Sequence, residues 1–90
     1  MTNQQKGAKM STAVTAEQVE QVVRTSLESF GADPDEINRE AELTALDIDS
    51  LDLAELSQIV EEQFGVNLTS SDVKSIVTVG DAVDLIVERA

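Results

Sequence analysis

Three segments of this 90-residue chain carry apolar residues at steps of three and four, the spacing that gathers side chains on one face of an α-helix. The stripes are Val19, Val22, Val23, Leu27 and Phe30; then Leu53, Leu56, Ile59, Val60 and Phe64; then Val79, Ala82, Val83, Ile86 and Val87. Each helix must bury its apolar face, and in a chain this short the faces can only pack on one another. An all-α bundle is therefore predicted.

Capping signals set the bounds of these helices. Thr15 is followed three residues later by Gln18, and Thr78 by Asp81, and both pairs are capping boxes. Gly31 follows the first helix, and Gly65 ends a second helix that spans about 50–64. A short third helix is expected near 71–76, with Thr69 or Ser70 as its cap. The prediction is a small four-helix bundle of three main helices and one short one.

A long connection, about 32–49, joins the first two main helices. It contains the only proline, Pro34, and four aliphatic anchors, Ile37, Leu43, Leu46 and Ile48. A loop of this length in a small domain is usually functional or held by its own side chains, so we expect these four to pin it to the bundle. Residues 1–14 are polar and are predicted to form a flexible N-terminal tail, which leaves 15–90 as one domain.

The chain is strongly acidic, with 18 Asp and Glu against six Lys and Arg, for a net charge of −12. Lys6 and Lys9 lie in the tail, so residues 11–90 hold four bases and 18 acids, and 4 − 18 gives −14. Such a surface repels nucleic acid and anionic lipid and attracts proteins with basic patches. Solubility is the simpler explanation. However, Asp47 to Glu62 holds six acids and no base, and such uncompensated repulsion favours a docking role.

Several residue types are missing from the chain. It has no His, Cys, Trp or Tyr, and so lacks the usual general base of hydrolases and transferases. We therefore expect no enzymatic activity. The lack of Cys fits a reducing cytoplasm. No apolar run approaches a membrane span and no secretory signal is present, so we expect a cytoplasmic monomer without membrane insertion.

Ser50 stands at the junction of the long loop and the second helix. Its simplest role is a helix cap, but Asp49 is better placed for that, which leaves the Ser50 hydroxyl free. A calcium loop that starts at Asp47 would need an oxygen ligand at Leu51, glycine at position 52 and glutamate at position 58, and the pattern fails at all three. A catalytic serine would need a base and a glycine-flanked turn, which are absent. Ser50 is thus predicted to be an acceptor that another enzyme modifies.

The chain resembles the acyl carrier protein family. The triplet Asp49-Ser50-Leu51 matches the family's attachment motif, and residues 43–56 look like its loop end and second helix. Residues 60–66 look like the acidic end of that helix with its aromatic stop, and 78–83 like the start of the last helix. The resemblance extends over about residues 19–87.

The resemblance implies a specific function. Ser50 would accept 4′-phosphopantetheine from coenzyme A, transferred by a separate phosphopantetheinyl transferase with magnesium, and acyl groups would ride on the arm as thioesters. Asp49 and Leu51 would help to present the attachment point. The family's acidic docking face is matched by Asp52, Glu55, Glu61 and Glu62. These residues would meet basic patches on acyltransferases and ketosynthases.

Two departures from the family pattern leave the pathway open. Asp47 stands where the family often has glycine, and a charged side chain there is expected to alter the approach of the loop to the helix. Leu43 is spaced from Ser50 as in polyketide and peptide carriers, whereas the acids of the helix look like the fatty-acid type. The alternatives are an acidic interaction module without covalent cargo and, less favoured, an amino-acid carrier.

Overall fold

The computed structural model describes residues 14–90, so the predicted tail, apart from Val14, lies outside the described residues. The helices are α1 (Ala16–Ser29), α2 (Ser50–Phe64), α3 (Ser70–Ser75) and α4 (Val79–Arg89). Two short 3-10 turns, η2 (Pro34–Glu36) and η3 (Thr44–Leu46), lie in the loop between α1 and α2. Residues 14–90 form no β-strand beyond an isolated bridge between Glu42 and Thr78. The predicted four-helix fold is confirmed.

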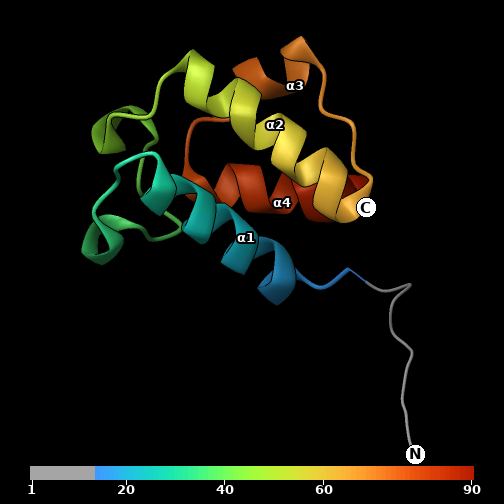
Figure 1. Ribbon diagram of the computed structural model, residues 1–90, viewed down its shortest axis with the longest axis horizontal. Coiled ribbons are helices and arrows are strands. Elements are labelled where there is room, and N and C mark those ends of the chain that lie inside the picture. Colours follow the sequence, from blue (N-terminus) through green and yellow to red (C-terminus); the bar gives the residue numbers. More distant parts are fainter. Residues whose placement is uncertain (1–13) are drawn as a thin grey trace, which may run out of the picture.

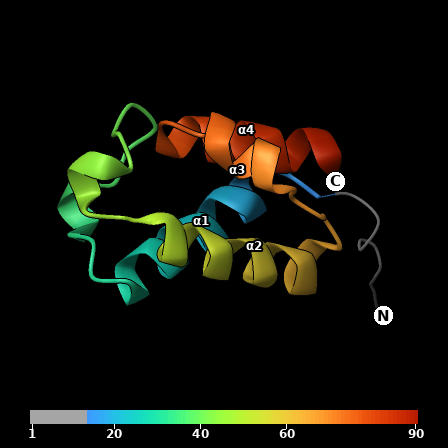
Figure 2. The ribbon, with the colours of Figure 1, turned by 90° about the horizontal axis from the view of Figure 1, so that it is seen from above.

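The helices pack around α1. Helix α1 contacts both α4 and α2, and the short α3 packs against α2 (Figures 1 and 2). In Figure 2 the long loop closes one end of the bundle, where it passes from the end of α1 to the start of α2. This arrangement leaves the first turn of α2 at the loop end of the molecule, beside α3.

The core is aliphatic. Its buried members from the helices are Val19, Val23 and Leu27 of α1, Leu56 and Val60 of α2, and Val79, Ala82, Val83 and Ile86 of α4. Removing each of the Val, Leu and Ile side chains from water contributes about 1.5–3 kcal/mol. The outer members of the predicted stripes, among them Phe30 and Phe64, are only half-buried and pack on the rim of this core.

All four helices begin with a capping box. The two predicted pairs, Thr15–Gln18 and Thr78–Asp81, are present with both of their hydrogen bonds. Helix α3 begins one residue earlier than predicted, after Thr69, and it ends at Ser75 because Ile76 turns to extended backbone and enters the core. Gly31 (φ 106°) and Gly65 (φ 70°) take the left-handed backbone expected after α1 and α2.

Buried side chains and backbone hydrogen bonds hold the long loop against the helices. The four predicted anchors, Ile37, Leu43, Leu46 and Ile48, are all buried. The backbone of the loop is hydrogen-bonded to the start of α4: Leu43 N–H donates to Val77 O (3.0 Å), Val79 N–H to Ala41 O (3.0 Å) and Gly80 N–H to Arg39 O (2.9 Å). The segment that leads into α2 is therefore held by the body of the bundle.

Candidate functional site

Ser50 is the first residue of α2 and is exposed. The preceding residue is the N-cap: the Asp49 carboxylate accepts from Asp52 N–H at 2.9 Å, and the Asp52 carboxylate accepts from Asp49 N–H at 3.2 Å. The capping role predicted for Asp49 is thus confirmed. The Ser50 hydroxyl makes no hydrogen bond to any residue in the described range 14–90. Because Asp49 does the capping, this hydroxyl is available for reaction.

The backbone of Asp47 takes a conformation that suits glycine best. Its backbone is left-handed, with φ 62° and ψ 30°, where η3 ends and the chain turns towards α2. Glycine adopts this conformation without penalty, and aspartate is among the few other residues that tolerate it. The next residue, Ile48, is buried, and its N–H donates to Leu43 O at 3.0 Å. Ser50 is therefore presented only two residues beyond a fixed core anchor.

A groove of about 370 Å³ opens beside Ser50, between α2 and the segment that contains α3. From α2 it is lined by Ser50, Ala54 and Ser57, and from the facing segment by Leu68, Thr69, Ser70, Val73 and Lys74. The wall is largely apolar, and no carboxylate lines it. A reactive hydroxyl at the edge of such a groove suits the attachment of a flexible arm that can lie partly against the protein.

The predicted docking residues do not all lie on the same side of α2. At about 100° per residue, Leu51, Glu55 and Glu62 share one solvent-facing arc, and all three are exposed. Leu51 is 78% exposed, an unusual state for a large apolar side chain. Asp49 is exposed before the first turn, but its carboxylate is engaged in the cap. Leu51 therefore projects to solvent from the first turn of a helix face that also exposes Glu55 and Glu62.

The other two predicted docking residues lie off that arc. Asp52 is half-buried at its edge and is committed to the capping box. Glu61 is exposed but lies on nearly the same side of α2 as Ser50. Gln58 is exposed at the edge of the arc, on the Leu51 side, and was missed, although its position seven residues after Leu51 could have indicated it.

Three of the four cations in residues 14–90 are engaged away from α2. Arg24 donates to the carbonyls of Ile37 and Pro34 and so braces the loop. Arg39 contacts both oxygens of Asp84 at 2.8 Å, and Arg89 forms a two-point pair with Asp72 at 2.6 and 2.8 Å. No acid of α2 forms an ion pair with a described residue.

Hydrogen bonds shift the pKa of Asp72, Arg89, Arg39 and Asp81. The hydrogen bond from Arg89, supported by the Thr69 N–H, holds the pKa of Asp72 far below its ordinary value, and the same pair raises the pKa of Arg89. Asp84 likewise raises the pKa of Arg39, and the backbone N–H groups of Thr78 and Val77 lower that of Asp81. All of these groups lie on α3, α4 or the loop, so these charges serve the fold.

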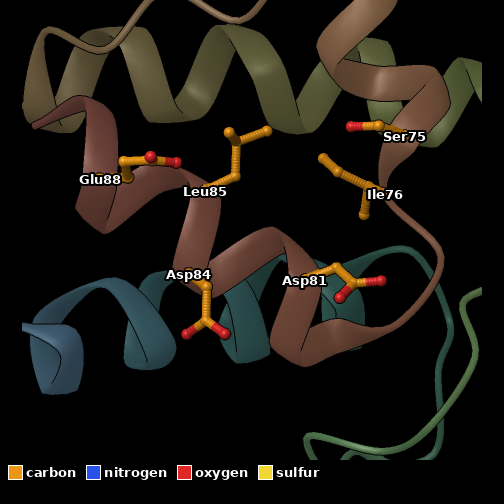
Figure 3. A pocket seen from close by; sticks show the side chains of 6 residues that line it. All are labelled: Ser75, Ile76, Asp81, Asp84, Leu85 and Glu88. Carbon is orange, nitrogen blue, oxygen red and sulfur yellow. The ribbon is translucent and has the colours of Figure 1, made fainter.

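A second hollow, of about 280 Å³, lies between α3 and α4 (Figure 3). Its carboxylates include Asp81, which accepts from the N–H groups of Val77 and Thr78 at 3.1 Å at the start of α4, and Asp84, which is paired with Arg39. Figure 3 shows Ile76 and Leu85 on the upper side of the hollow, whereas Asp84 points away from them. Across residues 14–90, no cluster of three potential metal ligands is present. The one hydroxyl that lines this hollow, that of Ser75, donates to Asp72 O at 2.7 Å, unlike the Ser50 hydroxyl.

The described helices include none that is long and apolar enough to cross a membrane.

Comparison with known proteins gives a consistent result. Residues 17–86 match the family described as the phosphopantetheine attachment site. The chain is 41% identical over 76 residues to an acyl carrier protein of Zymomonas mobilis, an alignment that covers 83% of this chain and 94% of that protein.

Solved structures agree. The acyl carrier protein of Enterococcus faecalis superposes with a TM-score of 0.73 at 29% identity, over 86% of this chain and 100% of that one. The acetyl form of the actinorhodin acyl carrier protein of Streptomyces coelicolor gives a TM-score of 0.65 at 24% identity, over 89% and 94%. The second likeness concerns the fold alone.

Proposed function

This chain belongs to the acyl carrier protein family, and from that premise we propose that Ser50 is the residue to which its 4′-phosphopantetheine cofactor is attached. The protein is a carrier and not a catalyst. The observation that supports Ser50 is the division of labour at the start of α2, where Asp49 caps the helix and the exposed Ser50 hydroxyl bonds to nothing in residues 14–90.

The attachment needs only the Ser50 hydroxyl from this chain. Its oxygen forms a phosphodiester with the phosphopantetheine half of coenzyme A, the nucleotide half leaves, and the hydroxyl proton passes to a base on the transferase. The group supplies, once bound, a terminal thiol that forms thioesters with acyl cargo. This Cys-free sequence has no thiol of its own.

Intact mass spectrometry tests the attachment. The protein is incubated with coenzyme A, magnesium and a broad-specificity phosphopantetheinyl transferase. Wild type should gain one phosphopantetheine and Ser50→Ala none. Ser57→Ala is the matched control, because Ser57 lines the same groove but its hydroxyl donates to Leu53 O at 3.1 Å. Failure of wild type to gain mass would leave an acidic interaction module as the better description.

We further propose that partners dock on the exposed arc of α2. Leu51, Glu55 and Glu62 would contact the basic patches of the transferase, acyltransferases and ketosynthases, and Asp49, Asp52 and Glu61 would flank that contact. Exposed charge pairs add little lasting affinity but raise encounter rates, which suits a carrier that must release each partner. The cargo would be acyl intermediates of fatty-acid or polyketide synthesis, with an amino acid less favoured.

Charge-neutral variants test the docking face. Glu55→Gln and Glu62→Gln should each lower kcat/KM for modification by the transferase several-fold, chiefly through slower association. Glu17→Gln on α1 is the matched control, since Glu17 is also an exposed helical glutamate. Equal effects of all three substitutions would indicate dependence on net charge alone and would contradict a defined docking face.

The monomeric state, the cytoplasmic location and the domain bounds of 15–90 stay predictions.

A further inference from the structure

Lys74, in the last turn of α3, is the one cation of residues 14–90 that forms no side-chain hydrogen bond or ion pair with another described residue. It is exposed on α3 and lines the same groove as Ser50. Among the cations of the described residues, Arg24, Arg39 and Arg89 are each bonded to a carbonyl or a carboxylate, whereas Lys74 has neither within reach. The one ammonium group of this part of the chain is therefore uncommitted.

The local sequence also leaves Lys74 without a countercharge. Its neighbours at three and four positions along the chain, Ser70, Ser71, Val77 and Thr78, carry no acid. Asp72 is close in sequence, but both of its oxygens are held by Arg89. In a body with 18 acids and four bases, this local absence of acid is a notable feature.

The groove itself favours a negatively charged occupant near Lys74. Its wall comprises the apolar Ala54, Leu68 and Val73, several hydroxyls and one ammonium, without a carboxylate. An oxyanion that enters here meets attraction from Lys74, whereas on the exposed face of α2 it would meet Glu55 and Glu62. The flexible four-carbon stem of lysine lets its charge follow a ligand that is not rigidly placed.

We propose that Lys74 binds an oxyanion tethered to Ser50. This inference rests on the proposed attachment at Ser50 and deepens it. Two sources share the chemistry: the phosphodiester of the arm, and a carboxylate at the free end of an acyl cargo. Lys74 then orients the arm along the groove in the first case and favours dicarboxylic cargo in the second.

Nuclear magnetic resonance of defined loaded forms tests the proposal. The unmodified protein, the holo protein, a butyryl-loaded form and a succinyl-loaded form are compared by the amide shifts of residues 73–76 and by the ³¹P shift of the phosphodiester. The variant is Lys74→Gln. The matched control is Gln21→Glu, which lowers the net charge by the same amount at an exposed position on α1.

Comparison of these loaded forms distinguishes the phosphodiester from the cargo carboxylate as the oxyanion that Lys74 binds. Phosphodiester binding predicts shifts on passing from unmodified to holo protein that are lost in Lys74→Gln and kept in Gln21→Glu. Cargo binding predicts such Lys74-dependent shifts only between the butyryl and succinyl forms. In either case the shifts should shrink as salt rises. The proposal is overturned if Lys74→Gln reproduces every wild-type shift.

Intact mass keeps this result distinct from the attachment itself. Lys74→Gln should gain the same phosphopantetheine mass as wild type, because the hydroxyl that reacts is unchanged. A protein that never gains mass refutes the attachment at Ser50. A protein that gains mass but shows no Lys74-dependent shift refutes only the role of Lys74.

Discussion

Asp49 and Asp52 cap each other's backbone amides across the first turn of α2, with carboxylate-to-nitrogen distances of 2.9 and 3.2 Å. Ser50, which directly follows Asp49, therefore does not have to cap the helix. The order of residues is significant, since a serine at the cap itself would have its oxygen engaged. The helix start is thus stable without the hydroxyl.

The first prediction follows from that division. Asp49→Ala should lower the free energy of unfolding by about 1 kcal/mol, the usual loss for a removed N-cap. Ser50→Ala should change it by less than about 0.5 kcal/mol, as expected at an exposed site without a specific contact. Urea denaturation followed by circular dichroism measures both. Asp49→Asn, which retains a capping oxygen, is the control, and a larger loss for Ser50→Ala than for Asp49→Ala would mean that the capping roles are reversed.

The second prediction concerns the left-handed backbone of Asp47, at φ 62°. Asp47→Val should be less stable than Asp47→Gly by about 1–2 kcal/mol, because a β-branched residue pays the steric cost of this conformation and glycine does not. Thermal unfolding of the two variants side by side gives the difference. Equal melting temperatures would show that the turn before α2 can relax to another conformation.

The third prediction concerns Gly80 at the start of α4. A Cβ built there would lie 3.0 Å from Arg39 O and 3.3 Å from Arg39 Nη2, and the Gly80 N–H donates to that same carbonyl. Alanine improves helix propensity by about 1 kcal/mol, but forcing the loop away costs about 1–3 kcal/mol. Gly80→Ala should therefore lower the melting temperature. A rise would show that the loop yields at no cost.

The fourth prediction is a pH dependence from Asp72. Its pKa in the folded protein lies far below the ordinary value of 3.8 because of Arg89, so the pair stabilises the fold at pH above 3.8, and this stabilisation is lost as the pH falls through the folded pKa. Asp72→Asn should therefore be less stable than wild type at pH 7, and the gap should narrow below about pH 4. Urea unfolding across pH 7 to 3 measures the gap. Thr25→Ala, which changes no titratable group at an exposed position on α1, should keep a constant difference from wild type across this range.

The fifth prediction concerns salt. Residues 11–90 carry a charge of −14, and salt screens both the self-repulsion of the fold and its attraction to partners. Raising the ionic strength, or adding magnesium, should therefore raise the melting temperature while it slows association with the transferase. An association rate that does not change with salt concentration would contradict electrostatic attraction between this protein and the transferase.

Much of this architecture could be predicted because the local signals agree with the fold. Short-range sequence patterns predicted the capping pairs at Thr15 and Thr78 and the glycines at positions 31 and 65. The apolar character of Ile37 likewise predicted its burial. The position of Ser50 directly after the N-cap residue Asp49 also follows from the local sequence.

The remaining features depend on tertiary contacts. The pairings of Arg89 with Asp72 and of Arg39 with Asp84 join residues 17 and 45 positions apart. The sequence around Lys74 does not indicate that this residue lines the same groove as Ser50. The separation of Glu61 from Glu62 required knowing which side of α2 packs on the bundle.

Fragmentation mass spectrometry on the modified protein tests the central claim most directly. Cleavage after Arg39 and Lys74 releases residues 40–74, which contain Ser50 together with the other groove hydroxyls of Ser57, Thr69 and Ser70. The whole phosphopantetheine mass should be found on Ser50. Modification of any other hydroxyl in this peptide, or an unmodified peptide after complete incubation, would contradict it.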